Sequence, residues 1–341
     1  MQYRVPLLAL IGGLVTGGAA LGLGGRAHAQ PDGDFKGKTI TVYIGFGSGG
    51  GYDQYARLFA RHVGRHIPGN PTIVPSNMHG ANGIVAANYL YNSAARDGTA
   101  IGFLYQAIAQ DQVLLQANVQ YDATKFNWIG RITSTAEIMY TWHRAPVQKV
   151  EDLATRETVF GVAGPLIVTY TRLLKSSMGA RFKIVRGYKS TAEIHIAMER
   201  GEVEGAYSSL STVRSGWNNW LTDKLVNILV QMVPERHPDL AAVPTIVELG
   251  KSTEDKAVMK FFAASGAVGR SVVAPPGVPP DRVEILRAAF HATMRDPQFL
   301  AEARQMKFDV EPLPGGELAM IAKRVVGLGA AERERAQAMA K

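Results

Sequence analysis

Two glycine-rich turns carry the residue types best suited to holding a small ligand. They span residues 45–51 (GFGSGGG) and 76–83 (SNMHGANG), and each lies between an apolar, β-branched run and a run with helical spacing. A turn that opens a helix leaves backbone N–H groups unpaired, and the helix dipole adds partial positive charge. We therefore expect a carboxylate or similar anion there. The alternative is a pair of tight turns without a ligand.

A nucleotide cofactor is not expected at the first turn. Gly45, Gly47 and Gly50 match the dinucleotide fingerprint, but no Asp or Glu follows between Gln54 and Arg96 to hold a ribose. The lysine of a phosphate-binding loop is missing too. Asp53 lies near the third position of the next helix, where it would cap the backbone or order a water rather than face an anion.

Other constellations give no catalytic centre. His62 and His66 have the i, i+4 spacing of metal ligands, but no acid lies near them in sequence, and a solvated basic face is the favoured interpretation. A lone His79 in a loop is more often idle than ligating. There is no cysteine and no G-x-S-x-G nucleophile motif. We expect no metal, no cofactor and no enzymatic activity.

Strand and helix patterns alternate along the chain, which indicates an α/β protein. Polar or small residues follow two more expected strands, at residues 163–165 and at Ser208 and Ser209. Ligands of open α/β sheets bind outside the carboxyl ends of strands. Four such turns facing one cleft would form a clamp. The tail from Ala330 is charged, and we expect it to fray.

Length and composition limit the compartment and the partners. The 341 residues fit two domains, and the formal charge is +8. Arg4, an apolar run and Ala27-His28-Ala29 have the layout of a secretory signal, with a membrane anchor as the alternative. Cleavage near Ala29 leaves a charge of +6. An exported, periplasmic protein is not expected to bind nucleic acid.

The motifs together resemble the Bug-type extracytoplasmic receptors of tripartite tricarboxylate transporters, over nearly all of the mature chain. The residues that carry this resemblance are Phe46, Gly49, Gly50, Asp53, Ala56 and Arg57, the run 77–83, Asp97-Gly98, Tyr188-Lys189, Pro244-Thr245 and the run 274–279. His79 and Asn82 depart from the proline and glycine that the family has in its second turn.

The resemblance implies a two-domain clamshell of the type II periplasmic-binding-protein fold with mainly parallel sheets. We expect residues 30–132 and 265–341 to form domain 1 and residues 133–264 to form domain 2, with crossings near residues 130–135 and 262–268. The turns of domain 1 would hold a carboxylate and those of domain 2 would close over it. The ligand-binding candidates are Phe46, Gly47, Ser48, Gly49, Gly50, Gly51, Asp53, Ser76, Asn77, His79, Gly80, Ala81, Ala163, Gly164, Pro165, Tyr188, Ser208 and Ser209.

The function predicted is capture of a small organic acid in the periplasm by a monomer, for delivery to membrane permease subunits. The apolar run 162–166 favours a ligand with an apolar or aromatic body. Arg57, Arg61 and Arg65 would bias the surface toward anions. A sensor for a membrane signalling partner, or a periplasmic enzyme on the same scaffold, is the alternative.

Overall fold

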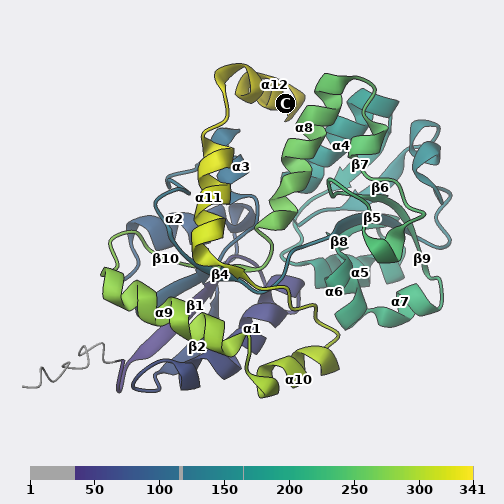
Figure 1. Cartoon of the computed structure of the whole chain (residues 1–341). Helices are drawn as coiled ribbons and strands as arrows, with labels where there is room; N and C mark the ends of the chain where they lie inside the picture. Colours follow the sequence, from purple (N-terminus) through teal and green to yellow (C-terminus); the bar gives the residue numbers. More distant parts are fainter. Residues whose placement is uncertain (1–34, 115–117, 164, 341) are drawn as a thin grey trace, which may run out of the picture. The chain divides into compact units, whose positions relative to one another are not determined.

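Two β-sheets organise the computed structural model, which describes residues 35–114, 118–163 and 165–340 (Figure 1). The predicted signal sequence lies outside the described residues. In the described part of the chain the first sheet has the order β11-β4-β10-β3-β1-β2 and the second has the order β7-β6-β8-β5-β9. The strands of the first sheet are β1 (Thr39–Ile44), β2 (Thr72–Asn77), β3 (Ala100–Phe103), β4 (Asn127–Arg131), β10 (Ser271–Ala274) and β11 (Leu313–Pro314). Those of the second are β5 (Glu137–Trp142), β6 (Thr158–Gly161), β7 (Phe182–Val185), β8 (Gly205–Ser209) and β9 (Val226–Gln231).

Helices alternate with these strands, which confirms the α/β class. α1 packs against β2, α9 and α10, and α11 packs against β4. In the second sheet α5 packs against β8. The helices are α1 (Gly51–Val63), α2 (Ile84–Asn92), α3 (Ile108–Val113), α4 (Pro165–Met178), α5 (Thr191–Glu199), α6 (Leu210–Gly216), α7 (Asn218–Thr222), α8 (Thr253–Ala263), α9 (Pro280–Thr293), α10 (Pro297–Gln305), α11 (Gly315–Val326) and α12 (Ala330–Ala340).

Both sheets are mixed. The expected parallel pairing joins β1 to β2 and β3, and β6 to β7 and β8. Antiparallel pairing enters through β10, which returns between β3 and β4, and through β5, which lies between β8 and β9. β11 is also antiparallel to its partner β4. β5 and β10 are the strands that directly follow the two places where the chain passes between the sheets.

Those two crossings, residues 132–136 and 264–270, are hydrogen-bonded to each other. Ile132 N donates to Arg270 O at 2.9 Å, Arg270 N donates to Thr133 O at 3.0 Å, and Thr135 N donates to Gly266 O at 3.0 Å. A Cβ on Gly269, whose φ is +53°, would lie 2.1 Å from Thr133 O, so the approach requires glycine. By their contacts, the described residues of both sheets form one unit. The predicted boundaries between domain 1 and domain 2 therefore stay a prediction.

The C-terminal segment is ordered, and the expectation of a frayed tail was wrong. α12 packs against α4 and α8 (Figure 1). Ala336 is only 1% exposed, and Gln337 Nε2 donates to Val113 O at 2.9 Å. The segment is rich in the strong helix formers Ala, Glu and Arg, and contacts with distant segments add to this local preference.

A buried histidine lies in the core beside the second sheet. His195 on α5 is fully buried, with ring centroids of Trp217 and Trp220 at 4.0 and 4.7 Å. Its Nε2 contacts the hydroxyl of Tyr140, and its Nδ1 has no partner. Burial disfavours the charged imidazolium and lowers the pKa of His195 to about 3.

This histidine makes folding sensitive to acid. The unfolded chain takes up the proton near pH 6.5, whereas the folded chain does so only near pH 3. The free energy of unfolding should fall as pH drops through that interval, by up to about 1.4 kcal/mol per pH unit from this group. We expect His195→Gln to flatten the dependence, measured by urea unfolding at pH 7 and pH 4.5. Parallel curves for variant and parent would contradict the assignment.

Candidate functional site

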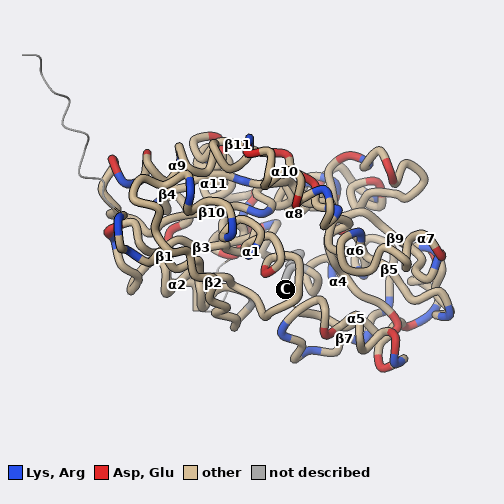
Figure 2. The backbone as a smooth tube through the Cα atoms, turned by 90° about the horizontal axis from the view of Figure 1, so that it is seen from below, with Lys and Arg blue, Asp and Glu red and all other residues tan. Residues whose placement is uncertain are grey.

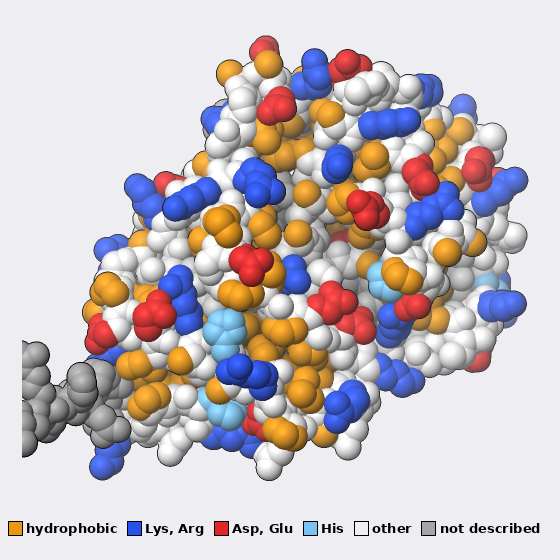
Figure 3. Space-filling model, viewed as in Figure 1, with side chains coloured by type: hydrophobic (Ala, Val, Ile, Leu, Met, Phe, Trp, Pro, Cys, Tyr) orange, Lys and Arg blue, Asp and Glu red, His pale blue; other side chains and the backbone are white. Residues whose placement is uncertain are grey.

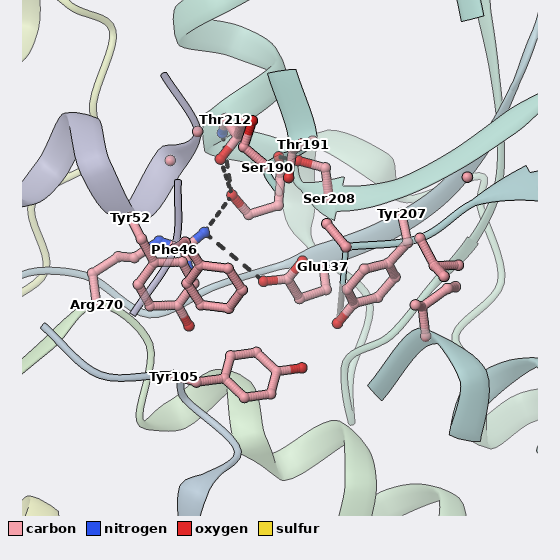
Figure 4. Close-up of a pocket in the computed structure, with 17 residues that line it drawn as sticks. Phe46, Tyr52, Tyr105, Glu137, Ser190, Thr191, Tyr207, Ser208, Thr212 and Arg270 are labelled. Atoms are coloured by element: carbon pink, nitrogen blue, oxygen red, sulfur yellow. Dashed lines mark hydrogen bonds and ion pairs between the residues drawn. The ribbon is translucent and has the colours of Figure 1, made fainter. Parts of the chain in front are cut away.

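A cavity of about 70 Å³ lies among turns from both sheets and the two crossings (Figure 4). The first sheet contributes the segment after β1, the start of α1 and the segment after β3. The second contributes the ends of β6 and β8 and the starts of α5 and α6. The lining residues are Phe46, Gly50, Gly51, Tyr52, Tyr105, Glu137, Gly161, Val162, Ala163, Ile167, Ser190, Thr191, Tyr207, Ser208, Ser209, Thr212 and Arg270.

Arg270 is the cation of this cavity and is only 3% exposed. Its Nη2 donates to Ser209 Oγ at 3.0 Å, and its guanidinium carbon lies 4.0 Å from the ring centroid of Tyr52. Its Nε and Nη1 have no hydrogen-bond partner. Buried guanidinium donors left unpaired are costly, so an arginine in this state fits a site that receives an anion.

Glu137, the first residue of β5, is the opposing charge. Its Oε1 lies 3.9 Å from Arg270 Nη2, and the residue is 5% exposed. Burial raises the pKa of Glu137, while Arg270 and the side chains of Gln106 and Tyr207 oppose that rise. Burial lowers the pKa of Arg270, but Tyr52, Glu137 and further neighbours outweigh it, and the pKa is raised. Arg270 therefore stays charged.

Aromatic and aliphatic side chains form the remaining walls. Phe46 stacks on Tyr52 at 4.6 Å between ring centroids and meets Tyr105 edge-on at 5.5 Å. Burial raises the pKa of Tyr52 to about 12, so its hydroxyl stays protonated at neutral pH. The buried hydroxyl of Tyr207 has no partner, and Figure 4 shows it directed toward the region between Glu137 and Tyr105.

The first predicted turn borders the cavity, and some of its backbone donors are already used. Gly47 N donates to Lys189 O at 3.2 Å, and Gly49 N donates to Asp53 Oδ2 at 2.9 Å. Asp53 is 4% exposed and also accepts from Arg57 Nε and Asn77 Nδ2. It caps the turn, as its place at the third position of α1 suggested. The expected anion hole of backbone N–H groups is not open at Gly47 and Gly49.

The second predicted turn lines a neighbouring hollow of about 260 Å³. His79, Gly80, Ala81 and Tyr188 lie there together with Arg186 and Lys189, and the hollow shares Phe46, Val162 and Ala163 with the cavity. Asn77 instead faces inward, donating to Phe46 O at 2.9 Å. Asn77 thus stabilises the first turn, and His79, Gly80 and Ala81 line the hollow outside the cavity.

The candidate residues fall into three groups. The cavity includes Phe46, Gly50, Gly51, Ala163, Ser208 and Ser209, and the hollow adds His79, Gly80, Ala81 and Tyr188. The residues that line neither are Gly47, Ser48, Gly49, Asp53, Ser76 and Asn77. Gly164 lies outside the described residues, as does the side chain of Pro165.

The two charged residues of the cavity were missed from the sequence, as were Tyr52, Tyr105 and Tyr207. A usable signal existed in both cases. Glu137 opens the otherwise uncharged run EIMYTW, and Arg270 directly precedes the buried strand SVVA. A single charge next to a buried strand must be satisfied inside the protein, which marks it as a candidate for a site.

The arginines of the acid-free stretch are paired, contrary to the expected anion-attracting face. Arg57 binds Asp53, whereas Arg61 pairs with Glu302 of α10 and Arg65 pairs with Asp296, the N-cap of α10. Figures 2 and 3 show charges of both signs intermixed. His62 and His66 also meet these acids, so the face is a helix–helix contact rather than a solvated basic surface.

In the part of the chain that the structure describes, no three His, Asp or Glu side chains gather in a way that could hold a metal ion. Over the same residues, no helix has the length and apolar character needed to span a membrane.

Comparison with known proteins decides the family. The profile described as "Tripartite tricarboxylate transporter family receptor" (TctC) matches residues 56–321. The chain belongs to this family. A relative, the UPF0065 protein in the gbd 5' region of Cupriavidus necator, is 24% identical over 88% of this chain and 87% of its own length.

Solved structures confirm the fold. Rpa4515 of R. palustris with adipate has a TM-score of 0.68 at 22% identity, over 89% of this chain and 97% of its own. MatC from Rhodopseudomonas palustris with bound malate has a TM-score of 0.67 at 20% identity, over 89% of this chain and 99% of its own. The α/β periplasmic-binding-protein fold expected from the sequence is therefore correct for this TctC receptor.

The Asp53 cap offers a test of the first turn. We expect Asp53→Ala to lower the free energy of unfolding by about 1–3 kcal/mol, because Gly49 N, Arg57 and Asn77 lose a shared acceptor. Urea unfolding measures the change. Exposed Asp223→Ala is the matched control and should stay close to the parent. Equal stability of both variants would show that the cap contributes little.

Proposed function

We propose that this chain is an exported, monomeric receptor that binds a small organic carboxylate at Arg270 and delivers it to the permease subunits of a tripartite transporter. The observation that carries the proposal is the buried guanidinium with Nε and Nη1 unpaired in a cavity. Such donors match a carboxylate in charge and in planar geometry. The carboxylates named for the two R. palustris structures, adipate and malate, support the same ligand class.

Capture by this site requires no chemical step. Lining residues come from both sheets, so a ligand in the cavity contacts turns of both and favours the arrangement in which they are close. The crossings at residues 132–136 and 264–270 are the covalent links between the sheets, and a change of arrangement must be absorbed there.

Arg270 allows a direct test of the ligand class. Removing it alone would leave Glu137 buried without a counter-charge, so we would combine Arg270→Gln with Glu137→Gln. A carboxylate at a hundredfold excess over its Kd should stabilise the parent by about 2.7 kcal/mol and leave the double variant unchanged. Thermal unfolding against mono- and dicarboxylates measures this effect.

Arg200→Gln is the control, because that arginine is exposed and lies outside the cavity. It should keep the full response of the parent. No response of the parent to any carboxylate would contradict the proposal. Equal stabilisation of the double variant and the parent by a carboxylate would show that the carboxylate does not bind at Arg270.

A further inference from the structure

We infer that the ligand is a zwitterion, an amino acid with an uncharged side chain, whose carboxylate meets Arg270 and whose ammonium group meets Glu137. This inference rests on the proposed receptor function and narrows it. A buried acid beside Arg270 is not needed to hold a carboxylate, so Glu137 needs its own explanation.

The two charged groups do not use their hydrogen-bonding capacity on each other. Glu137 Oε1 and Arg270 Nη2 are 3.9 Å apart, which is beyond hydrogen-bonding distance. Arg270 keeps Nε and Nη1 unpaired, and both residues line the same cavity. A ligand with one negative and one positive group can satisfy both residues at once.

The charge balance of the cavity favours such a ligand over a simple acid. Among the described lining residues, Arg270 and Glu137 are the charged ones, and their formal charges cancel. A monocarboxylate would leave one uncompensated negative charge in a buried site. A dicarboxylate would in addition bring its second group toward Glu137 or out of the cavity. A zwitterion keeps the site neutral, which avoids the cost of burying net charge.

The walls fit the remaining parts of an amino acid. Tyr105 and Tyr207 flank Glu137 (Figure 4), and aromatic faces attract an ammonium group. Val162, Ala163 and Ile167 form an apolar wall that suits an uncharged side chain. Two further cationic residues, Arg186 and Lys189, line the outer hollow rather than the cavity itself.

The test uses matched compounds with the full mature chain. The compounds are the amino acids with uncharged side chains, β-alanine and γ-aminobutyrate. Calorimetry gives the Kd of each one and the Kd of the matching acid that lacks the amino group. We expect the parent to bind at least one amino acid about tenfold or more tightly than its partner acid. Glu137→Gln should abolish or reverse that preference while still binding carboxylates through Arg270. Exposed Glu235→Gln is the control and should keep the preference.

The ratio of the two Kd values measured on the parent protein, for an amino acid and for its matching acid, decides the inference even if Glu137→Gln fails to fold. Equal or tighter binding of the acids without an amino group would overturn the zwitterion and leave the receptor proposal standing. A preference for amino acids that Glu137→Gln retains would overturn the role of Glu137. If neither series nor any dicarboxylate binds, the receptor proposal falls as well.

Discussion

The burial of one guanidinium group is the constraint on which the rest of the site depends. Removing an ion from water costs several kcal/mol unless partners compensate for it, and Arg270 is 3% exposed. Ser209 comes from the second sheet, Glu137 from the strand after the first crossing, and Tyr52 from the start of α1. These partners meet only when both crossings and both sheets are in place, and together they still leave two donors unpaired.

The sequence predicted those helices and strands whose hydrophobic pattern and flanking turn residues lie within one short segment. The strand at β1 and the helix at α1 follow from the hydrophobic pattern on either side of the first turn. α12 was expected to fray and α8 was not anticipated, although α12 has strong helix formers and α8 begins with a capping box of Ser252 and Asp255. β4 was not anticipated because its partners β10 and β11 come from distant parts of the chain. The cavity shows the same division. Its turns were found from glycine content, whereas Glu137 and Arg270 are brought together only by the crossings.

The glycines of the first turn were identified in the sequence as candidates for anion binding, and the structure shows a second role for them in packing. They were expected to expose backbone donors to an anion. A Cβ on Gly51 would lie 2.2 Å from Thr212 Oγ1, and a Cβ on Gly47 would lie 3.1 Å from Lys189 O. Both neighbours belong to the second sheet's segments. Lack of side-chain bulk is therefore needed for the close approach of turns from the two sheets.

Arg270 is the last residue of one crossing and Glu137 is the first residue after the other, so both charges lie at the junctions between the two sheets. Any rotation at the crossings alters the spacing between these charges. Ligand binding and the equilibrium between arrangements of the two sheets are therefore thermodynamically coupled. Selection for a new solute could act on a few link residues while both hydrophobic cores stay untouched, and each such change would also reset how readily the empty receptor closes.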